Sequence, residues 1–180
     1  MKKQIAKMTV LGALVLCGIS AANAADGTIH FTGSVNAGSC NINVPDGGNV
    51  DLGSIRKREI AAGASGAKLG TPATFNIELS DCDPGKTNAA ITFGETTDAD
   101  ADNGDAFKLT PGSVAKGVGV TIWDANNAIL KPGVVAANSQ TFQDTVGGML
   151  TYQASYMVTK PSAAQDGTAN ADIDFRITYP

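Results

Sequence analysis

The sequence has few of the residues that enzymes use for chemistry. A single histidine, His30, occurs in 180 residues, and no second base or metal ligand lies near it in the sequence. Because catalytic and metal-bound histidines need such partners, we expect His30 on the solvent-facing side of a strand. No complete nucleophile or dinucleotide-binding motif is present either. The sequence therefore predicts a protein that is not an enzyme.

Calcium chemistry has one candidate motif, and this motif is incomplete. Asp98, Asp100 and Asp102 alternate in "DADADNGD". A calcium loop of the EF-hand type starting at Asp98 would need glycine at position 103 and glutamate at position 109, where the chain has Asn103 and Leu109. We expect a solvated acidic turn, with a calcium site as the alternative, and no cofactor.

Long hydrophobic runs are also missing. The apolar stretch from residue 8 to 19 is too short for an ordinary membrane span, and no later stretch approaches 18 apolar residues. Lysines precede it and the small-x-small sequence Ala22-Asn23-Ala24 follows, which is typical of a signal peptide over residues 1–24. Lipidation at Cys17 is disfavoured because the bulky Leu16 precedes it. We expect an exported protein that is soluble or assembled at a surface.

Basic residues are outnumbered in the mature chain. Cleavage after Ala24 leaves 156 residues, enough for one domain with a core of its own. The leader takes three of the 13 basic residues and none of the 17 acidic ones, so the mature chain has a formal charge of −7. This charge argues against nucleic acid and anionic membranes as partners.

The mature chain keeps two cysteines, Cys40 and Cys82. In an exported protein an even pair predicts one disulfide, and the alternative is two buried thiols. Closing a loop of about forty residues stabilises the fold by roughly 4 kcal/mol in the chain-entropy model.

Alternating apolar and polar residues predict a chain built of strands. No convincing 3.6-residue period occurs after the leader, and the alternating stretches are separated by clusters of Gly, Asn, Asp and Pro. This pattern predicts an all-β sandwich, and one disulfide is compatible with an immunoglobulin-like sandwich. The expected strands cover residues 28–35, 74–82, 89–94, 117–125, 148–159 and 171–179.

The last of these strands ends with the chain. Ile173, Phe175, Ile177 and Tyr179 share one face within eight residues of the terminus. Chain ends usually fray, so these four apolar side chains must be covered by another element.

Both ends of the mature chain resemble the chaperone-usher fimbrial subunits of the type 1 and P pilus kind. "GTIHFTGSVNAGSCNI" is similar to their N-terminal extension, which carries apolar-x-Phe-x-Gly ahead of the first cysteine, and "LSDC" supplies the second cysteine. "LTYQASYMVTKPSAAQDGTANADIDFRITYP" is similar to their closing segment with its penultimate tyrosine. The terminal Pro180 departs from the family pattern, because it removes a backbone N–H.

The resemblance implies an incomplete immunoglobulin-like β-sandwich that a donor strand from a neighbouring subunit completes. Residues 25–36 would be the donor-strand extension and residues 37–180 the pilin domain. The inserting residues would be Ile29, Phe31, Gly33 and Val35, and the acceptor residues, for the chaperone first and the donor strand later, would be Ile173, Phe175, Ile177 and Tyr179.

The implied function is that of a structural subunit of a bacterial surface fimbria that supports adhesion. Its implied partners are identical or related pilin subunits in a head-to-tail polymer, a periplasmic chaperone and an outer-membrane usher. We expect the repeated shaft subunit, because 156 residues leave no room for a receptor-binding domain; a minor adaptor or terminator is the alternative. Two other interpretations stay open: a monomeric exported lectin-like β-sandwich that binds a ligand, and a secreted hydrolase.

Overall fold

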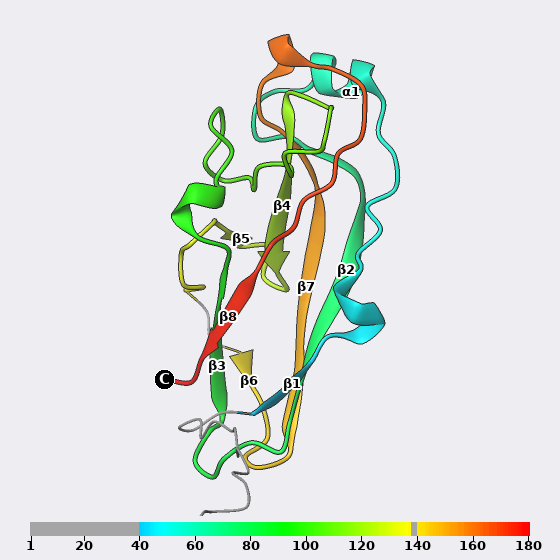
Figure 1. The fold of residues 1–180 in the computed structure, drawn as a ribbon. Helices are drawn as coiled ribbons and strands as arrows, with labels where there is room; N and C mark the ends of the chain where they lie inside the picture. The colour runs from blue at the N-terminus through cyan, green and yellow to red at the C-terminus, as the bar shows by residue number, and fades with distance from the viewer. Residues whose placement is uncertain (1–39, 138–139) are drawn as a thin grey trace, which may run out of the picture. The chain divides into compact units, whose positions relative to one another are not determined.

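The computed structural model describes residues 40–137 and 140–180 (Figure 1). The predicted signal peptide, the expected strand over residues 28–35 and His30 lie outside the described residues. The strands are β1 (Asn41–Asn43), β2 (Lys68–Ser80), β3 (Asn88–Phe93), β4 (Val118–Asp124), β5 (Ile129–Leu130), β6 (Gln140–Thr141), β7 (Gly147–Val158) and β8 (Phe175–Thr178). The short helical segments are α1 (Lys57–Ala62), η1 (Pro45–Gly48), η2 (Thr96–Asp98) and η3 (Pro161–Ala163).

A five-stranded antiparallel sheet in the order β1-β2-β7-β4-β5 forms one layer. Its centre is β7, which pairs with β2 and with β4 along most of its length. The alternation in the sequence places Leu150, Tyr152 and Ala154 on one face of β7, and all three are buried. The strands expected over residues 117–125 and 148–159 are therefore confirmed.

A three-stranded antiparallel sheet in the order β6-β3-β8 forms the second layer. In Figure 1, β8 (red) runs beside β3 (green) and lies in front of the five-stranded sheet. Ile177 lies opposite Ile91 in the ladder, and Phe175 lies opposite Phe93. Because β3 occupies one edge of β8, the other edge has no partner strand among the residues that the structure describes.

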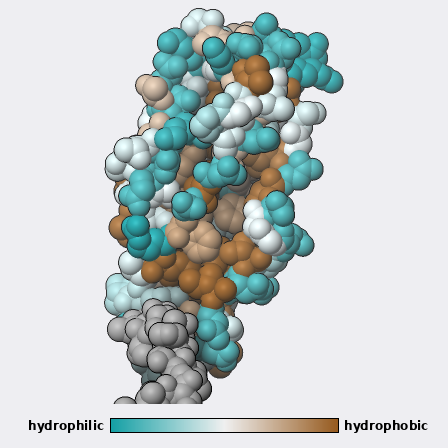
Figure 2. Space-filling view, in the orientation of Figure 1, coloured by the Kyte–Doolittle hydropathy of each residue, from teal (hydrophilic) through white to brown (hydrophobic). Residues whose placement is uncertain are grey.

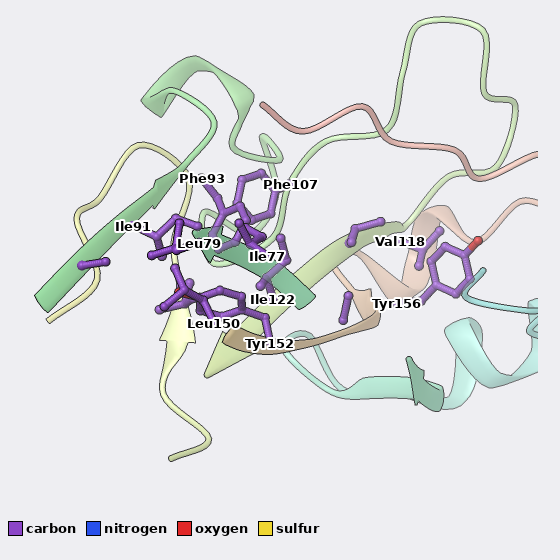
Figure 3. Close-up of a cluster of buried hydrophobic side chains, with 14 of the residues drawn as sticks. Ile77, Leu79, Ile91, Phe93, Phe107, Val118, Ile122, Leu150, Tyr152 and Tyr156 are labelled. Atoms are coloured by element: carbon purple, nitrogen blue, oxygen red, sulfur yellow. The ribbon is translucent and has the colours of Figure 1, made fainter. Parts of the chain in front are cut away.

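The core lies between the two sheets (Figure 3). Ile77, Ile91, Phe93, Leu150 and Tyr152 are each at most 3% exposed, and the rings of Phe93 and Tyr152 meet edge to face with centroids 5.2 Å apart. Aromatic pairs of this geometry contribute about 0.5–1.5 kcal/mol beyond the burial of their area. The prediction of an all-β sandwich is confirmed. No helix of the described residues is long and apolar enough to cross a membrane.

The predicted disulfide between Cys40 and Cys82 is present. Cys40 immediately precedes β1, and Cys82 follows the end of β2 by two residues. Asn41 of β1 pairs with Ser80 of β2, so the disulfide closes the end of this strand pair.

The C-terminal strand is shorter than predicted. The alternation indicated a strand from residue 171 to 179, whereas β8 covers Phe175–Thr178. The backbone before β8 bonds outside the sheet: Thr110 N–H donates to the Asn170 carbonyl at 2.8 Å, and Val114 N–H donates to the Thr168 carbonyl at 3.0 Å. The backbone at residues 168–170 therefore follows the loop that precedes β4, and the chain meets the end of β3 at Asp174, whose carbonyl accepts the Gly94 N–H at 2.7 Å.

The helix α1 was not predicted. It has six residues, so it is too short to show a 3.6-residue period. Glu59 Oε2 accepts the Arg56 backbone N–H at 2.7 Å, which satisfies a donor at the start of the helix, and Ile60 is buried. Tertiary packing of Ile60 stabilises a helix that would be unstable alone.

Candidate functional site: an apolar groove beside the C-terminal strand

A groove of about 730 Å³ opens between the C-terminal segment and residues 44–53. Its floor comes from both sheets, and Figure 2 shows apolar (brown) surface in the hollow of this face with hydrophilic (teal) side chains around it. The floor residues are Phe75 and Ile77 of β2, Phe93 of β3, Val120 and Ile122 of β4, and Ala154 and Tyr156 of β7. One wall is the segment 44–53, and the other is Ala169, Asn170, Ala171, Ile173 and Phe175.

The floor is an aromatic and aliphatic surface that is not fully covered. Phe75 is half-buried, and its ring lies 6.0 Å from that of Phe93 and 5.7 Å from that of Tyr152. The Tyr156 hydroxyl donates to the Ala169 carbonyl at 3.0 Å, which joins the floor to the C-terminal wall. Burial raises the pKa of Tyr156, and the Asp51 carboxylate adds to this shift. The hydroxyl is therefore protonated and acts as a donor at neutral pH.

The wall at β8 carries an unpaired sheet edge. Gly94 N–H donates to the Asp174 carbonyl at 2.7 Å, so the backbone of Asp174 points toward β3. Backbone groups alternate in an antiparallel ladder, so those of Phe175 and Ile177 point away from β3. Their N–H and C=O groups are in position to pair with one further strand.

The opposite wall, residues 44–53, is held by local hydrogen bonds. Asn49 N–H donates to the Asp46 carbonyl at 3.3 Å, and Gly53 N–H donates to Asp51 Oδ1 at 2.8 Å. Asp46 adopts a left-handed conformation with φ of 56°, which a short polar side chain tolerates. Asp46 and Asp51 are the charged residues lining the groove within the described chain, and no lysine or arginine of that part lines it.

The groove takes in two of the four predicted acceptor residues. Ile173 and Phe175 line it. Ile177 lies opposite Ile91 and packs against the core cluster, and Tyr179 packs against the same cluster at the end of the strand. The four residues predicted for the donor strand, Ile29, Phe31, Gly33 and Val35, lie outside the described residues.

Several lining residues were not predicted from the sequence as part of the acceptor site. Phe75 and Tyr156 occupy inward positions of predicted strands, so the alternation could have identified them as core-facing. The segment 44–53 carries no such signal, because its turn-formers indicate a loop without indicating which surface the loop follows.

The carboxylates of the acidic turn, Asp98, Asp100 and Asp102, do not converge on a common point. Asp98 pairs with Lys108 at 3.2 Å, Asp100 Oδ1 accepts the Asp102 N–H at 2.9 Å, and Asp102 pairs with Lys160 at 2.9 Å. The Glu95 N–H and then Lys108 hold the pKa of Asp98 below its usual value. Within residues 40–137 and 140–180, no group of three potential metal ligands occurs.

Two antiparallel sheets, an unpaired edge at the last strand and an apolar groove beside it define an incomplete immunoglobulin-like sandwich. Solved structures share this fold. The crystal structure of the P pilus rod subunit PapA superposes with a TM-score of 0.61 at 19% identity, over 77% of this chain and 99% of that one. The structure of a chaperone-usher pilus gives a TM-score of 0.61 at 20% identity, over 87% of this chain and 96% of that one.

The chain belongs to the fimbrial protein family, whose model matches residues 29–180. It is 35% identical to the type-1 fimbrial protein, A chain, of Escherichia coli K12, with 99% of this chain and 100% of the relative covered. It is 34% identical to the fimbrial subunit type 1 of Klebsiella pneumoniae over the same shares of the two chains. The protein is therefore a structural subunit of a cell-surface fimbria, in a family of structural subunits rather than enzymes.

Proposed function

We propose that the groove accepts residues 25–36 of another subunit, which add a strand to the free edge of β8 and cover the groove floor. The observation that carries this proposal is that the unpaired edge of β8 continues directly from an apolar groove, the two meeting at Phe175. Strand addition uses both features, since the edge supplies backbone hydrogen bonds and the groove receives alternate side chains.

The donor segment and the groove correspond in length. The C-terminal wall runs from Ala169 to Phe175, which is seven residues. The apolar face of the extension runs from Ile29 to Val35, also seven residues. At about 3.3 Å per residue both span roughly 20 Å. Phe31 supplies the largest side chain, and Gly33 allows the backbones to approach closely.

An open edge of this kind promotes aggregation until it is covered. We infer that a periplasmic chaperone first lends a strand to the groove, and that the donor segment of the next subunit replaces this strand at an outer-membrane usher. Each subunit then gives one strand and receives another, so the contact is head-to-tail and extends into a filament. The subunit has no catalytic role in this proposal.

Two altered chains test strand addition. Deleting residues 25–36 should abolish fibres while the subunit still folds with its chaperone. Appending a copy of Asp26 to Asn36 to Pro180 through a flexible linker should fill the groove within one chain and give a stable monomer. The matched control carries aspartate in place of the appended copy of Phe31.

The readouts are electron microscopy of cells, size-exclusion chromatography and thermal unfolding. We expect the appended chain to melt well above the control. Fibres formed by the deletion variant would contradict strand addition. Equal melting temperatures for the appended chain and its control would also contradict it, and would favour a closed monomeric binding module.

A further inference from the structure

The side chain of Tyr179 links the two sheets beyond the last residue that lines the groove. Cys40 N–H donates to Tyr179 Oη at 3.3 Å, and the rings of Phe142 and Tyr179 meet edge to face with centroids 6.2 Å apart. Lys86 Nζ donates to the Tyr179 carbonyl at 3.3 Å. Three segments far apart in the sequence therefore hold this residue in place.

The partner of the phenol is itself fixed. Cys40 is buried and bonded to Cys82, and it leads directly into β1 at the edge of the five-stranded sheet. Tyr179 follows β8, which belongs to the three-stranded sheet. The hydrogen bond between them thus spans from one sheet to the other. Tyr179 is four residues past Phe175, the last residue of the chain that lines the groove.

The alternation of the donor segment does not set its register by itself. Moving a strand by two residues keeps the same side chains facing the groove, because the side-chain period of a strand is two. A two-residue shift would place Phe31 where Ile29 or Gly33 belongs. A groove that was open at both ends would therefore admit several registers, and a fixed obstacle at one end would exclude those that shift the strand toward that end.

We propose that Tyr179 is this obstacle: its ring, hydrogen-bonded to Cys40 and packed on Phe142, closes the space between the sheets beyond the groove, at the C-terminal end of β8, and prevents the inserted strand from shifting toward that end. Tyr179 is a positioning residue, and its role rests on the proposed strand addition. The ring supplies the steric stop, and the bond from the Cys40 N–H keeps the ring directed across the space between the sheets.

The test is photo-crosslinking in assembled fibres of the full chain. The photoreactive analogue p-benzoylphenylalanine replaces Phe31, the fibres are irradiated, and mass spectrometry locates the crosslink on the neighbouring subunit. The parent should crosslink at a single position between Ala169 and Phe175 or on the facing floor. Tyr179→Ala should add a second position at Ile177 or beyond. Tyr179→Phe, which keeps the ring, should retain the parental position as the major one.

The outcomes separate the two proposals. A parent that assembles into fibres but gives no crosslink between subunits would overturn strand addition itself. An unchanged single position in Tyr179→Ala fibres would overturn the role of Tyr179 and leave strand addition standing. If Tyr179→Ala assembles no fibres, Tyr179→Leu takes its place, because leucine fills apolar space but cannot accept the Cys40 N–H; an unchanged position there would again overturn the role.

Discussion

Replacing Phe31 by aspartate examines strand addition at a single side chain. Burying a phenylalanine stabilises a contact by about 1.5–3 kcal/mol, which the variant loses. The groove lining offers the new carboxylate no lysine or arginine within the described residues, and it already contains Asp46 and Asp51. An unpaired carboxylate in such surroundings costs several kcal/mol more, either as a buried charge or through forced protonation.

The combined loss is about 5 kcal/mol or more, which corresponds to a factor of more than 10³ in the affinity of one subunit for the next. Phe31→Asp should therefore assemble no fibres, while the subunit itself folds with its chaperone. Thr32→Asp is the matched control, because it adds the same charge on the opposite face of the donor segment. Thr32→Asp should assemble fibres.

The assay counts fibres per cell by electron microscopy and measures the amount of subunit in the periplasm by immunoblotting. Similar subunit levels with fibres in Thr32→Asp and none in Phe31→Asp would agree with the proposal. Fibres of parental number and length in Phe31→Asp would refute the reasoning, and so would equal loss of fibres in both variants with both subunits present.

Two further predictions concern stability and charge. Cys40→Ser combined with Cys82→Ser should lower the free energy of unfolding of the chain with the appended donor by about 4 kcal/mol, because the disulfide joins residues that are 42 apart in the sequence. Urea unfolding measures this loss, and a loss below about 1 kcal/mol would contradict the prediction. Asp98 should titrate below the usual 3.8, because the Glu95 N–H and then Lys108 favour its carboxylate. Its contribution to stability is therefore present above pH 3.8 and is lost as the pH falls through the lowered pKa. In an NMR titration Lys108→Ala should raise the pKa of Asp98 part of the way back to 3.8. A pKa at or above 3.8 in the parent would contradict the prediction.

The long central strands were predictable because their signal is local. In β7 every second residue from Leu150 to Val158 is buried, as the alternation indicates. In β4 all seven residues are buried, so the alternation predicted the strand but not the burial of both its faces. The disulfide was equally predictable, since the predicted mature chain keeps two cysteines and the predicted signal peptide implies an oxidising compartment.

The ends of the strands were less predictable, because they depend on which distant segments compete for the backbone hydrogen bonds. Ile173 continues the alternation of the last strand but lies outside β8. The backbone at residues 168–170 is already bonded to the loop before β4, and this loop is about sixty residues away in the sequence. A local pattern carries no information about such a competitor.

The sequence by itself determined the all-β class, the disulfide and the alternation of large apolar side chains in residues 28–35 and 171–179, and it predicts an export signal. Each of these follows from composition or from a period of two. The tertiary structure alone decided where the groove lies, because its walls at residues 44–53 and 169–175 are more than a hundred residues apart and its floor uses four strands. It also placed Tyr179 against Cys40 rather than along the groove, since that contact requires the two sheets to stack before either residue can reach the other.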